Sequence, residues 1–129
     1  MIVGLGVDAC DTERLGRLVE RYGERFVRRV FTKAETARCR NSRRLHECLG
    51  GRFAAKEATL KALGTGLSNG IAWRDVELVS GEAQPPRIEL HRAAQRIAAA
   101  RGVENIHCSI THDGGMAIAV VVFERSPVT

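Results

Sequence analysis

The chain has 129 residues, of which 44% are hydrophobic and 27% are charged, and this composition is typical of a soluble globular protein. We therefore expect a single domain over residues 1–129. No apolar run reaches the roughly 18 residues that span a membrane, and the start MIVGLGVD lacks the basic region of a signal peptide. These features predict a cytoplasmic protein with no membrane partner. The net charge of +5 favours an acidic or phosphorylated partner.

The four cysteines contain no CxxC pair, and they are Cys10, Cys39, Cys48 and Cys108. A zinc site is therefore poorly supported. Because the chain shows no export signal, we expect four free thiols rather than two disulfides.

Residues 2–9, IVGLGVDA, predict a strand with apolar side chains on one face. The other face carries Gly4, Gly6 and Asp8. Two glycines before an aspartate leave this face bare, so another backbone or a ligand could approach Asp8 closely. The alternative is that Asp8 only caps the helix that follows.

Residues 11–31 predict a helix, and its apolar stripe consists of Leu15, Leu18, Val19 and Tyr22. Five arginines recur at spacings of three and four, which places them on one side of the helix: Arg14, Arg17, Arg21, Arg25 and Arg28. Two interpretations of this basic side stay open. It is either a solvated face partly paired with nearby glutamates or a docking face for an acidic protein.

Thr32 and Glu35 fit a capping box, so we expect a further short helix to begin at this point. A polar turn at Asn41-Ser42 follows, and four arginines surround it: Arg38, Arg40, Arg43 and Arg44.

Residues 45–63 predict a long central helix, and its buried stripe consists of Leu49, Phe53, Leu60 and Leu63. Glu57 follows Phe53 by four residues and so lies at the edge of this stripe, with Lys61 one turn further on. An ordinary Glu57–Lys61 pair would contribute only about 0.2–0.5 kcal/mol. Desolvating a carboxylate costs more than that, so Glu57 needs a stronger partner, such as a metal ion.

After the turn Gly64-Thr65-Gly66 the pattern changes to short strands and one alanine-rich helix. The helix is predicted over 91–102 with Gly102 as its C-cap, and the strands over 75–79, 87–90, 106–111 and 116–124. Asp113-Gly114-Gly115, between the last two strands, is a strong hairpin signal. We therefore expect an α+β fold, in which an antiparallel sheet packs against the long central helix and shorter helices.

Asp8, Glu57 and Lys61 are together suited to phosphate and metal chemistry. Two carboxylates suit Mg²⁺, which prefers oxygen ligands and keeps waters and substrate phosphates in its shell. The lysine suits a phosphate oxygen, and the turn Gly64-Thr65-Gly66 can offer bare backbone amides to an anion. Spacing alone does not establish that Asp8 and Glu57 meet.

Three segments also carry a family resemblance: GLGVDACDTERL, GRFAAKEATLKALGTG and SITHDGGMAIAVVV, which together span residues 4–122. In this order they resemble the holo-acyl-carrier-protein synthases, the small stand-alone 4′-phosphopantetheinyl transferases. The middle motif is highly specific. One departure is visible, because Ala9 and Cys10 stand where many family members carry aliphatic residues. That departure affects the expected packing near the metal but removes no proposed ligand.

The resemblance implies transfer of the phosphopantetheine arm of coenzyme A (CoA) to a serine of an apo acyl carrier protein, with release of 3′,5′-ADP. It implies an α+β fold and a homotrimer with active sites between subunits. By motif match, Asp8 and Glu57 would bind Mg²⁺ and Lys61 would contact the CoA phosphates, so these three form the catalytic set. Other residues along the CoA site would be Arg52, Gly66, Pro86, Arg87, Thr111 and His112. The remaining histidines are expected to be structural: His46, His91 and His107.

The serine proton needs an acceptor, and two candidates stay open: Glu57, or a metal-bound water oriented by a carboxylate. Carrier proteins of this kind are acidic, so the basic helix is expected to bring the acceptor serine to the metal. The first choices for this contact are Arg14 and Arg21, followed by Arg25 and Arg28. Whether the acceptor serves fatty acid or polyketide biosynthesis stays open.

Two other functions compete with this interpretation. The basic side allows a nucleic-acid-binding module, but aromatic residues make up only 5% of the chain, which argues against base stacking. Asp8 and Glu57 would also repel phosphates, so we expect no nucleic-acid partner. A CoA-binding protein without transferase activity would not need Asp8, Glu57 and Lys61 together. Substitution of Glu57 separates these readings, because only transferase activity should collapse.

Overall fold

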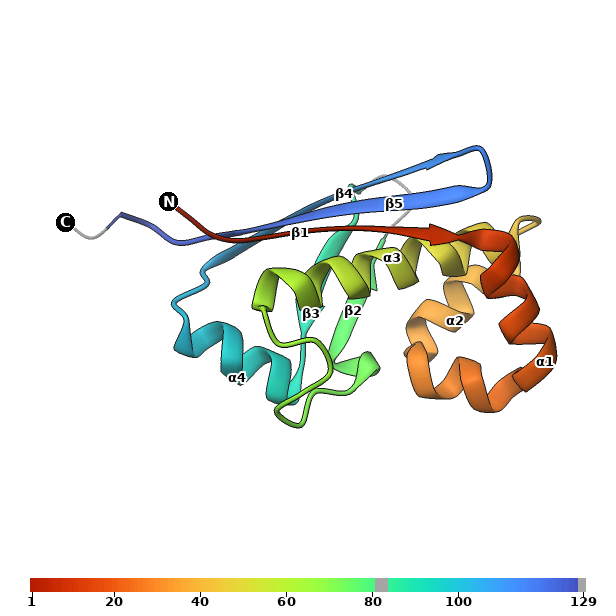
Figure 1. Ribbon diagram of the computed structural model, residues 1–129, viewed down its shortest axis with the longest axis horizontal. Coiled ribbons are helices and arrows are strands. Elements are labelled where there is room, and N and C mark those ends of the chain that lie inside the picture. The colour runs from red at the N-terminus through yellow and green to blue at the C-terminus, as the bar shows by residue number, and fades with distance from the viewer. Residues whose placement is uncertain (81–83, 128–129) are drawn as a thin grey trace.

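The computed structural model describes residues 1–80 and 84–127, and in it a long helix lies between a sheet and the remaining elements (Figure 1). The elements are, in chain order, β1 (Ile2–Asp11), α1 (Thr12–Val30), α2 (Lys33–Arg40), α3 (Leu45–Leu63), a 3₁₀ turn (Trp73–Asp75), β2 (Val76–Val79), β3 (Arg87–Leu90), α4 (Arg92–Ala100), β4 (Asn105–Asp113) and β5 (Met116–Glu124). The α+β fold is confirmed, and α3 has the bounds that the sequence predicted.

The strands form two antiparallel sheets rather than one. The first has the order β1-β5-β4, with Val7 opposite Val120 and Ser109 opposite Val120 from the other side. The second is the short hairpin β2-β3. The predicted tight turn between β4 and β5 is confirmed, because Gly114 and Gly115 have φ angles of 56° and 80°, values that favour glycine.

Helix α3 packs directly on the glycine face of β1. A Cβ atom added to Gly6 would lie 1.8 Å from the carbonyl oxygen of Ala58, and one added to Gly4 would lie 2.7 Å from that of Ala62. Only glycine permits a strand and a helix to approach so closely at these positions. The prediction that another backbone approaches this face is confirmed, and the close packing brings the end of β1 beside the middle of α3.

Helix α1 covers nearly all of the predicted residues 11–31, but it is interrupted at Gly23. Asp11, not Asp8, is its N-cap, and its Oδ1 accepts hydrogen bonds from the backbone N–H groups of Glu13 and Arg14 at 3.0 and 3.1 Å. The alternative that Asp8 is only a cap is therefore wrong. Gly23 interrupts the helix with non-helical angles, φ 63° and ψ −145°.

This interruption changes which side chains share a face. Helical periodicity does not continue across Gly23, so the prediction that all five arginines lie on one side is wrong for the whole set. Tyr22, predicted in the apolar stripe, is 53% exposed and directly precedes the interruption at Gly23. The stripe begins as expected, since Leu15 is buried.

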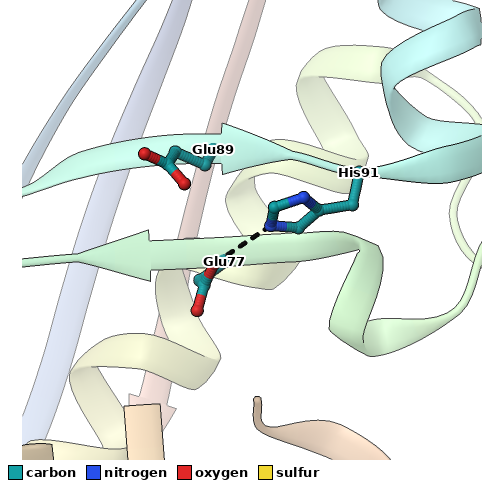
Figure 2. A group of neighbouring side chains, drawn as sticks. All are labelled: Glu77, Glu89 and His91. Atoms are coloured by element: carbon teal, nitrogen blue, oxygen red, sulfur yellow. Dashed lines mark hydrogen bonds and ion pairs between the residues drawn. The ribbon is translucent and has the colours of Figure 1, made fainter. Parts of the chain in front are cut away.

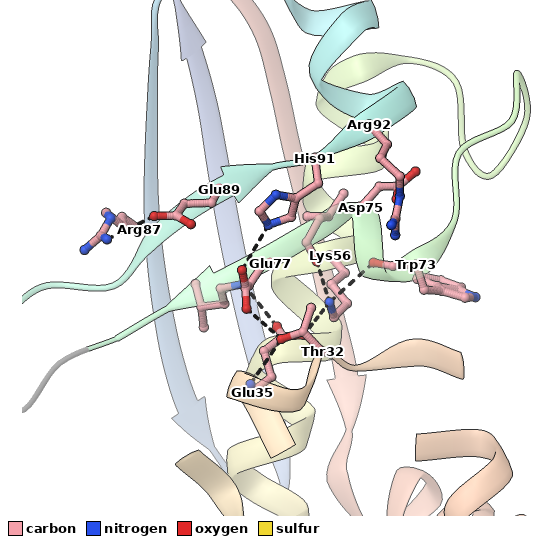
Figure 3. Close-up of polar contacts among 12 residues, drawn as sticks. Thr32, Glu35, Lys56, Trp73, Asp75, Glu77, Arg87, Glu89, His91 and Arg92 are labelled. Atoms are coloured by element: carbon pink, nitrogen blue, oxygen red, sulfur yellow. Dashed lines mark hydrogen bonds and ion pairs between the residues drawn. The ribbon is translucent and has the colours of Figure 1, made fainter. Parts of the chain in front are cut away.

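A buried ion pair joins α2, α3 and the start of β2 (Figure 3). Lys56 Nζ lies 2.7 Å from Glu35 Oε1, and both side chains are fully buried. Lys56 also donates to the backbone oxygen of Val76, and Glu35 accepts from the N–H groups of Thr32 and Leu78. The predicted capping box of Thr32 and Glu35 is therefore confirmed, and its glutamate has a second role that the sequence did not reveal.

The prediction of four free thiols is wrong for one pair. Cys39 and Cys48 form a disulfide with a Cα–Cα distance of 5.6 Å, whereas Cys10 and Cys108 are free. Residues 41–44 fold the chain back between α2 and α3, and this brings the two sulfur atoms together. Within residues 1–80 and 84–127, the helices are too short or too polar to cross a membrane.

Candidate active site

Asp8, Glu57 and Lys61 meet where β1 crosses α3. Lys61 Nζ lies 2.8 Å from Asp8 Oδ1 and 3.1 Å from the backbone oxygen of Val7. Glu57, one helical turn before Lys61, lies close enough to Asp8 for each carboxyl to shift the pKa of the other. The contact that spacing alone did not establish is therefore present. The lysine forms its ion pair with the aspartate of β1, so the simple pairing of Glu57 with Lys61 along the helix is not the arrangement found.

The electrostatics of this group separate the two carboxyls. Burial, together with the hydrogen bond to Asp8 and its negative charge, raises the pKa of Glu57 to about 7, while the positive charges of Lys61 and Arg14 oppose this rise. Burial would also raise the pKa of Asp8, but the hydrogen bonds from Glu57 and Lys61 outweigh it and lower the pKa. Near neutral pH, Asp8 is therefore ionised, whereas Glu57 is protonated in part of the molecules.

A hollow of about 310 Å³ opens beside Glu57. Its walls include the apolar side chains of Leu15, Leu18 and Phe53 and the charged side chain of Arg14. Cys10 also lines it, and burial and the nearby charges of Glu57 and Asp8 raise the pKa of this thiol to about 11. Cys10 therefore stays protonated near neutral pH and acts here as a small apolar side chain.

The donor set of this group fits a divalent cation. Two neighbouring carboxylates repel each other once both are ionised, and this repulsion adds to burial in raising the pKa of Glu57. A hard cation with oxygen ligands would relieve it, and Mg²⁺ bound by one or two carboxylates is common where phosphates are handled. Asp8 and Glu57 are thus suited to hold Mg²⁺, with Lys61 beside them.

Two of the residues predicted along the CoA site lie near the end of β4 but point apart. Thr111 is exposed and pairs with Ile118 on β5. His112 is also exposed, and its Nε2 lies 3.0 Å from the backbone oxygen of Glu47 in the first turn of α3. Neighbouring residues of a strand face opposite sides of the sheet, so His112 faces α3 and Thr111 faces away from it.

The other predicted CoA residues are spread over three places. Arg52 is only 7% exposed, and its guanidinium donates to the backbone oxygen of Cys48 and to Ser80 Oγ. Gly66 lies in the exposed turn after α3 with φ 58°. Pro86 and Arg87 lie at the start of β3, where Arg87 pairs with Glu89 at 3.0 Å. Their contacts with CoA stay predictions.

The arginines chosen for the partner surface are all exposed on α1, but they fall into two groups around Gly23. Arg14 lines the hollow beside Glu57, and the guanidinium of Arg21 lies 5.4 Å from the centre of the Tyr22 ring. Arg25 and Arg28 lie beyond the interruption, where Arg28 is 3.8 Å from Glu24. Of the first group, Arg14 is the residue that lies beside the Glu57 carboxyl.

A second group of possible metal ligands, which no sequence pattern indicated, lies at the β2-β3 hairpin and the residue that follows it (Figure 2). Ligand atoms of Glu77, Glu89 and His91 lie within 4.8 Å of one another. Each carboxylate already has a protein partner, because Glu77 accepts from Thr32 Oγ1 at 2.6 Å and lies 3.0 Å from His91, and Glu89 pairs with Arg87. We assign this cluster a structural role, which agrees with the expectation for His91.

Comparison with known proteins gives a consistent result. The model of the 4′-phosphopantetheinyl transferase superfamily matches residues 4–121. A holo-[acyl-carrier-protein] synthase of Methylobacterium radiotolerans is 47% identical over 133 aligned residues, which cover 100% of this chain and 98% of that protein.

Solved structures are similar over nearly the whole chain. The holo-[acyl-carrier-protein] synthase of Neisseria meningitidis has a TM-score of 0.88 at 28% identity, covering 97% of this chain and 100% of that one. The Helicobacter pylori enzyme, solved in complex with coenzyme A, has a TM-score of 0.81 at 28% identity, covering 93% of this chain and 99% of that one. The fold, the meeting of Asp8 with Glu57, and these matches agree: the chain belongs to the 4′-phosphopantetheinyl transferase superfamily.

Proposed function

We propose that Asp8, Glu57 and Lys61 form the centre at which this chain transfers the 4′-phosphopantetheine group of coenzyme A to a serine of an apo acyl carrier protein. The relatives are holo-[acyl-carrier-protein] synthases, and this chain is a transferase of the same kind. The observation that carries the assignment of the centre is the contact between β1 and α3, which joins two carboxylates and a lysine from distant parts of the chain.

Each of the three side chains has a separate task in this proposal. Asp8 and Glu57 would hold Mg²⁺, which when bound supplies positive charge to the CoA pyrophosphate and to the leaving 3′,5′-ADP. Lys61 is exposed and carries the positive charge that orients a phosphate oxygen. The serine proton would be accepted either by Glu57 or by a water that a carboxylate orients.

The hollow beside Glu57 is the approach that we assign to the acceptor serine. Arg14 and the apolar side chains of its walls lie on the first half of α1 and on α3. An acidic carrier protein would meet Arg14 and Arg21 there, and complementary charge would speed the encounter and fix its orientation. Arg25 and Arg28 turn away at Gly23, so we assign them a smaller share of the contact.

We also propose that the chain forms a homotrimer through the outer face of the β1-β5-β4 sheet. This face exposes four apolar side chains, and they are Leu5, Val7, Ile118 and Val120. Exposed apolar residues gathered on one sheet face are typical of an interaction surface. Thr111 lies on the same face, so a neighbouring subunit seated there would bring its own residues to the CoA site.

A cytoplasmic role in fatty acid biosynthesis fits a transferase that loads acyl carrier proteins, and we include it in the proposal. The test of the whole proposal is intact-mass spectrometry of an apo acyl carrier protein incubated with this chain, CoA and Mg²⁺. The carrier protein should gain the mass of one phosphopantetheine. The gain should disappear with EDTA and with Glu57→Ala, and it should persist with Glu20→Ala, a matched exposed glutamate on α1. No gain with several folded carrier proteins would refute the proposal.

A further inference from the structure

The disulfide between Cys39 and Cys48 lies where α2 ends and α3 begins. Cys39 is fully buried, and Cys48, in the first turn of α3, is partly exposed. Arg44 begins α3 but offers no side-chain cap among the described residues. A helix start without a side-chain cap frays readily, so the covalent bond contributes to holding this turn against α2.

The same turn supports a residue predicted to contact CoA. His112 Nε2 lies 3.0 Å from the backbone oxygen of Glu47, so this nitrogen is the donor. The ring also lies over Gly51, where an added Cβ would be 3.2 Å from Nε2. A hollow of about 210 Å³ opens beside it, lined in part by Arg44, Glu47 and His112. The position of His112 therefore depends on the residue next to Cys48.

Arg52 contacts Cys48 and is placed to stabilise the thiolate that reduction of the disulfide would produce. Its Nη1 lies 3.2 Å from both the backbone oxygen and the Sγ atom of Cys48, and its Nη2 lies 2.8 Å from Ser80 Oγ. Arg52 is buried, and its bonds to Ser80 and to the Cys48 backbone do not involve the disulfide, so we expect the guanidinium to stay beside the sulfur after reduction. A cation beside a cysteine sulfur favours the thiolate, which is both the product of disulfide reduction and the group that re-forms the bond.

We propose that Cys39–Cys48 is a reversible redox site through which a dithiol reductant weakens CoA binding. The inference rests on the proposed function. Disulfides in cytoplasmic proteins are commonly transient and redox-sensing, so a disulfide beside a substrate site fits this use. When the bond is broken, the first turn of α3 loses its tether to α2. The backbone oxygen of Glu47 then no longer holds His112 in place.

The exchange proceeds in two steps. A thiolate of the dithiol attacks the sulfur of Cys48, the more exposed of the two residues, the S–S bond breaks, and Cys39 leaves as a thiolate that takes up a proton. The second thiolate of the dithiol then attacks the mixed disulfide and releases Cys48 as a thiolate. The dithiol is oxidised to its own disulfide, and the two electrons reside on Cys39 and Cys48.

The test compares the oxidised and the dithiothreitol-reduced protein, with the state of each cysteine counted by alkylation and mass spectrometry. Isothermal titration should give a Kd for CoA that is at least fivefold higher after reduction. Cys39→Ser and Cys48→Ser should both show the higher Kd, with or without dithiothreitol. Cys108→Ser, which removes a free thiol, should keep the response. Hydrogen exchange should accelerate at residues 45–48 on reduction.

Three results would overturn the inference. One is four alkylated thiols in protein kept under oxidising conditions. Another is an equal Kd for CoA in the two states, with both states folded by circular dichroism. The third is a rate of hydrogen exchange at residues 45–48 that is the same in the oxidised and the reduced protein. Absence of CoA binding in both states, with exchange at 45–48 still responding to reduction, refutes the proposed function and with it the link to CoA, while the redox response itself is retained.

Discussion

Replacing Glu57 by glutamine should stabilise the folded protein while it abolishes transfer. The pKa of Glu57 is raised from 4.5 to about 7, so between these values the folded state binds a proton that the unfolded state releases. The contribution of Glu57 to the free energy of unfolding is therefore fully present below about pH 4.5, and it is lost as the pH rises through about 7. The shift corresponds to about 3 kcal/mol, and partial exposure of the carboxylate to solvent reduces it to about 1–2 kcal/mol.

Glutamine has the shape of the protonated side chain but cannot ionise. In metal-free buffer with EDTA at pH 8, Glu57→Gln should therefore melt higher than the wild type by about 3–10 °C, and at pH 4.5 the two should melt alike. Asp8 titrates in the opposite direction, because its lowered pKa adds stability above its ordinary value of 3.8, but both proteins retain it. Adding Mg²⁺ at pH 8 should raise the wild-type melting temperature and remove the difference.

Differential scanning calorimetry across pH 4.5–8 is the assay, and the exposed control Glu20→Gln should follow the wild type throughout. A loss of stability in Glu57→Gln that is equal at both pH values would refute the reasoning, since it would mean that the carboxylate makes a favourable contact in the folded state. Transfer activity, measured by carrier-protein mass, should be lost in Glu57→Gln under all these conditions.

Three further experiments test the packing and the assembly. Lys56→Met leaves the buried carboxylate of Glu35 without its cation and should cost about 3–5 kcal/mol in urea unfolding, whereas the double change with Glu35→Leu should recover part of this loss. Gly6→Ala places a methyl group 1.8 Å from a backbone oxygen of α3, and it should lower the melting temperature and transfer together. Leu5→Ser with Val7→Ser should convert a trimer to monomers in light scattering; an unchanged mass would contradict the proposed interface.

The helices and turns were predictable because the sequence patterns that indicate them are local. The helix over 45–63, the Thr32–Glu35 capping box and the Asp113-Gly114-Gly115 turn each depend on residues within a few positions of one another. The interruption at Gly23 was not recognised, because a single glycine within a helical pattern is commonly tolerated. Its consequence is large, since it divides the basic side of α1 into two surfaces.

The contacts between distant segments were harder to predict. Gly4 and Gly6 indicated that something approaches Asp8 closely, but the sequence did not say that this is α3. The pairing of Cys39 with Cys48 depends on how α2 and α3 fold back on each other, and no spacing rule gives that geometry. Disulfides are rare in cytoplasmic proteins, so free thiols were expected and the bond was not predicted.

The position of the Glu57 carboxylate follows from two constraints that act on α3 independently. The glycines of β1 set how closely the helix approaches the strand. The buried pair of Lys56 with Glu35 sets its rotation, because consecutive residues point about 100° apart around a helix. With Lys56 held toward α2, Glu57 is directed toward β1 and Asp8. A lysine that looks like an ordinary surface charge in the sequence thus orients the carboxylate that the proposed chemistry needs.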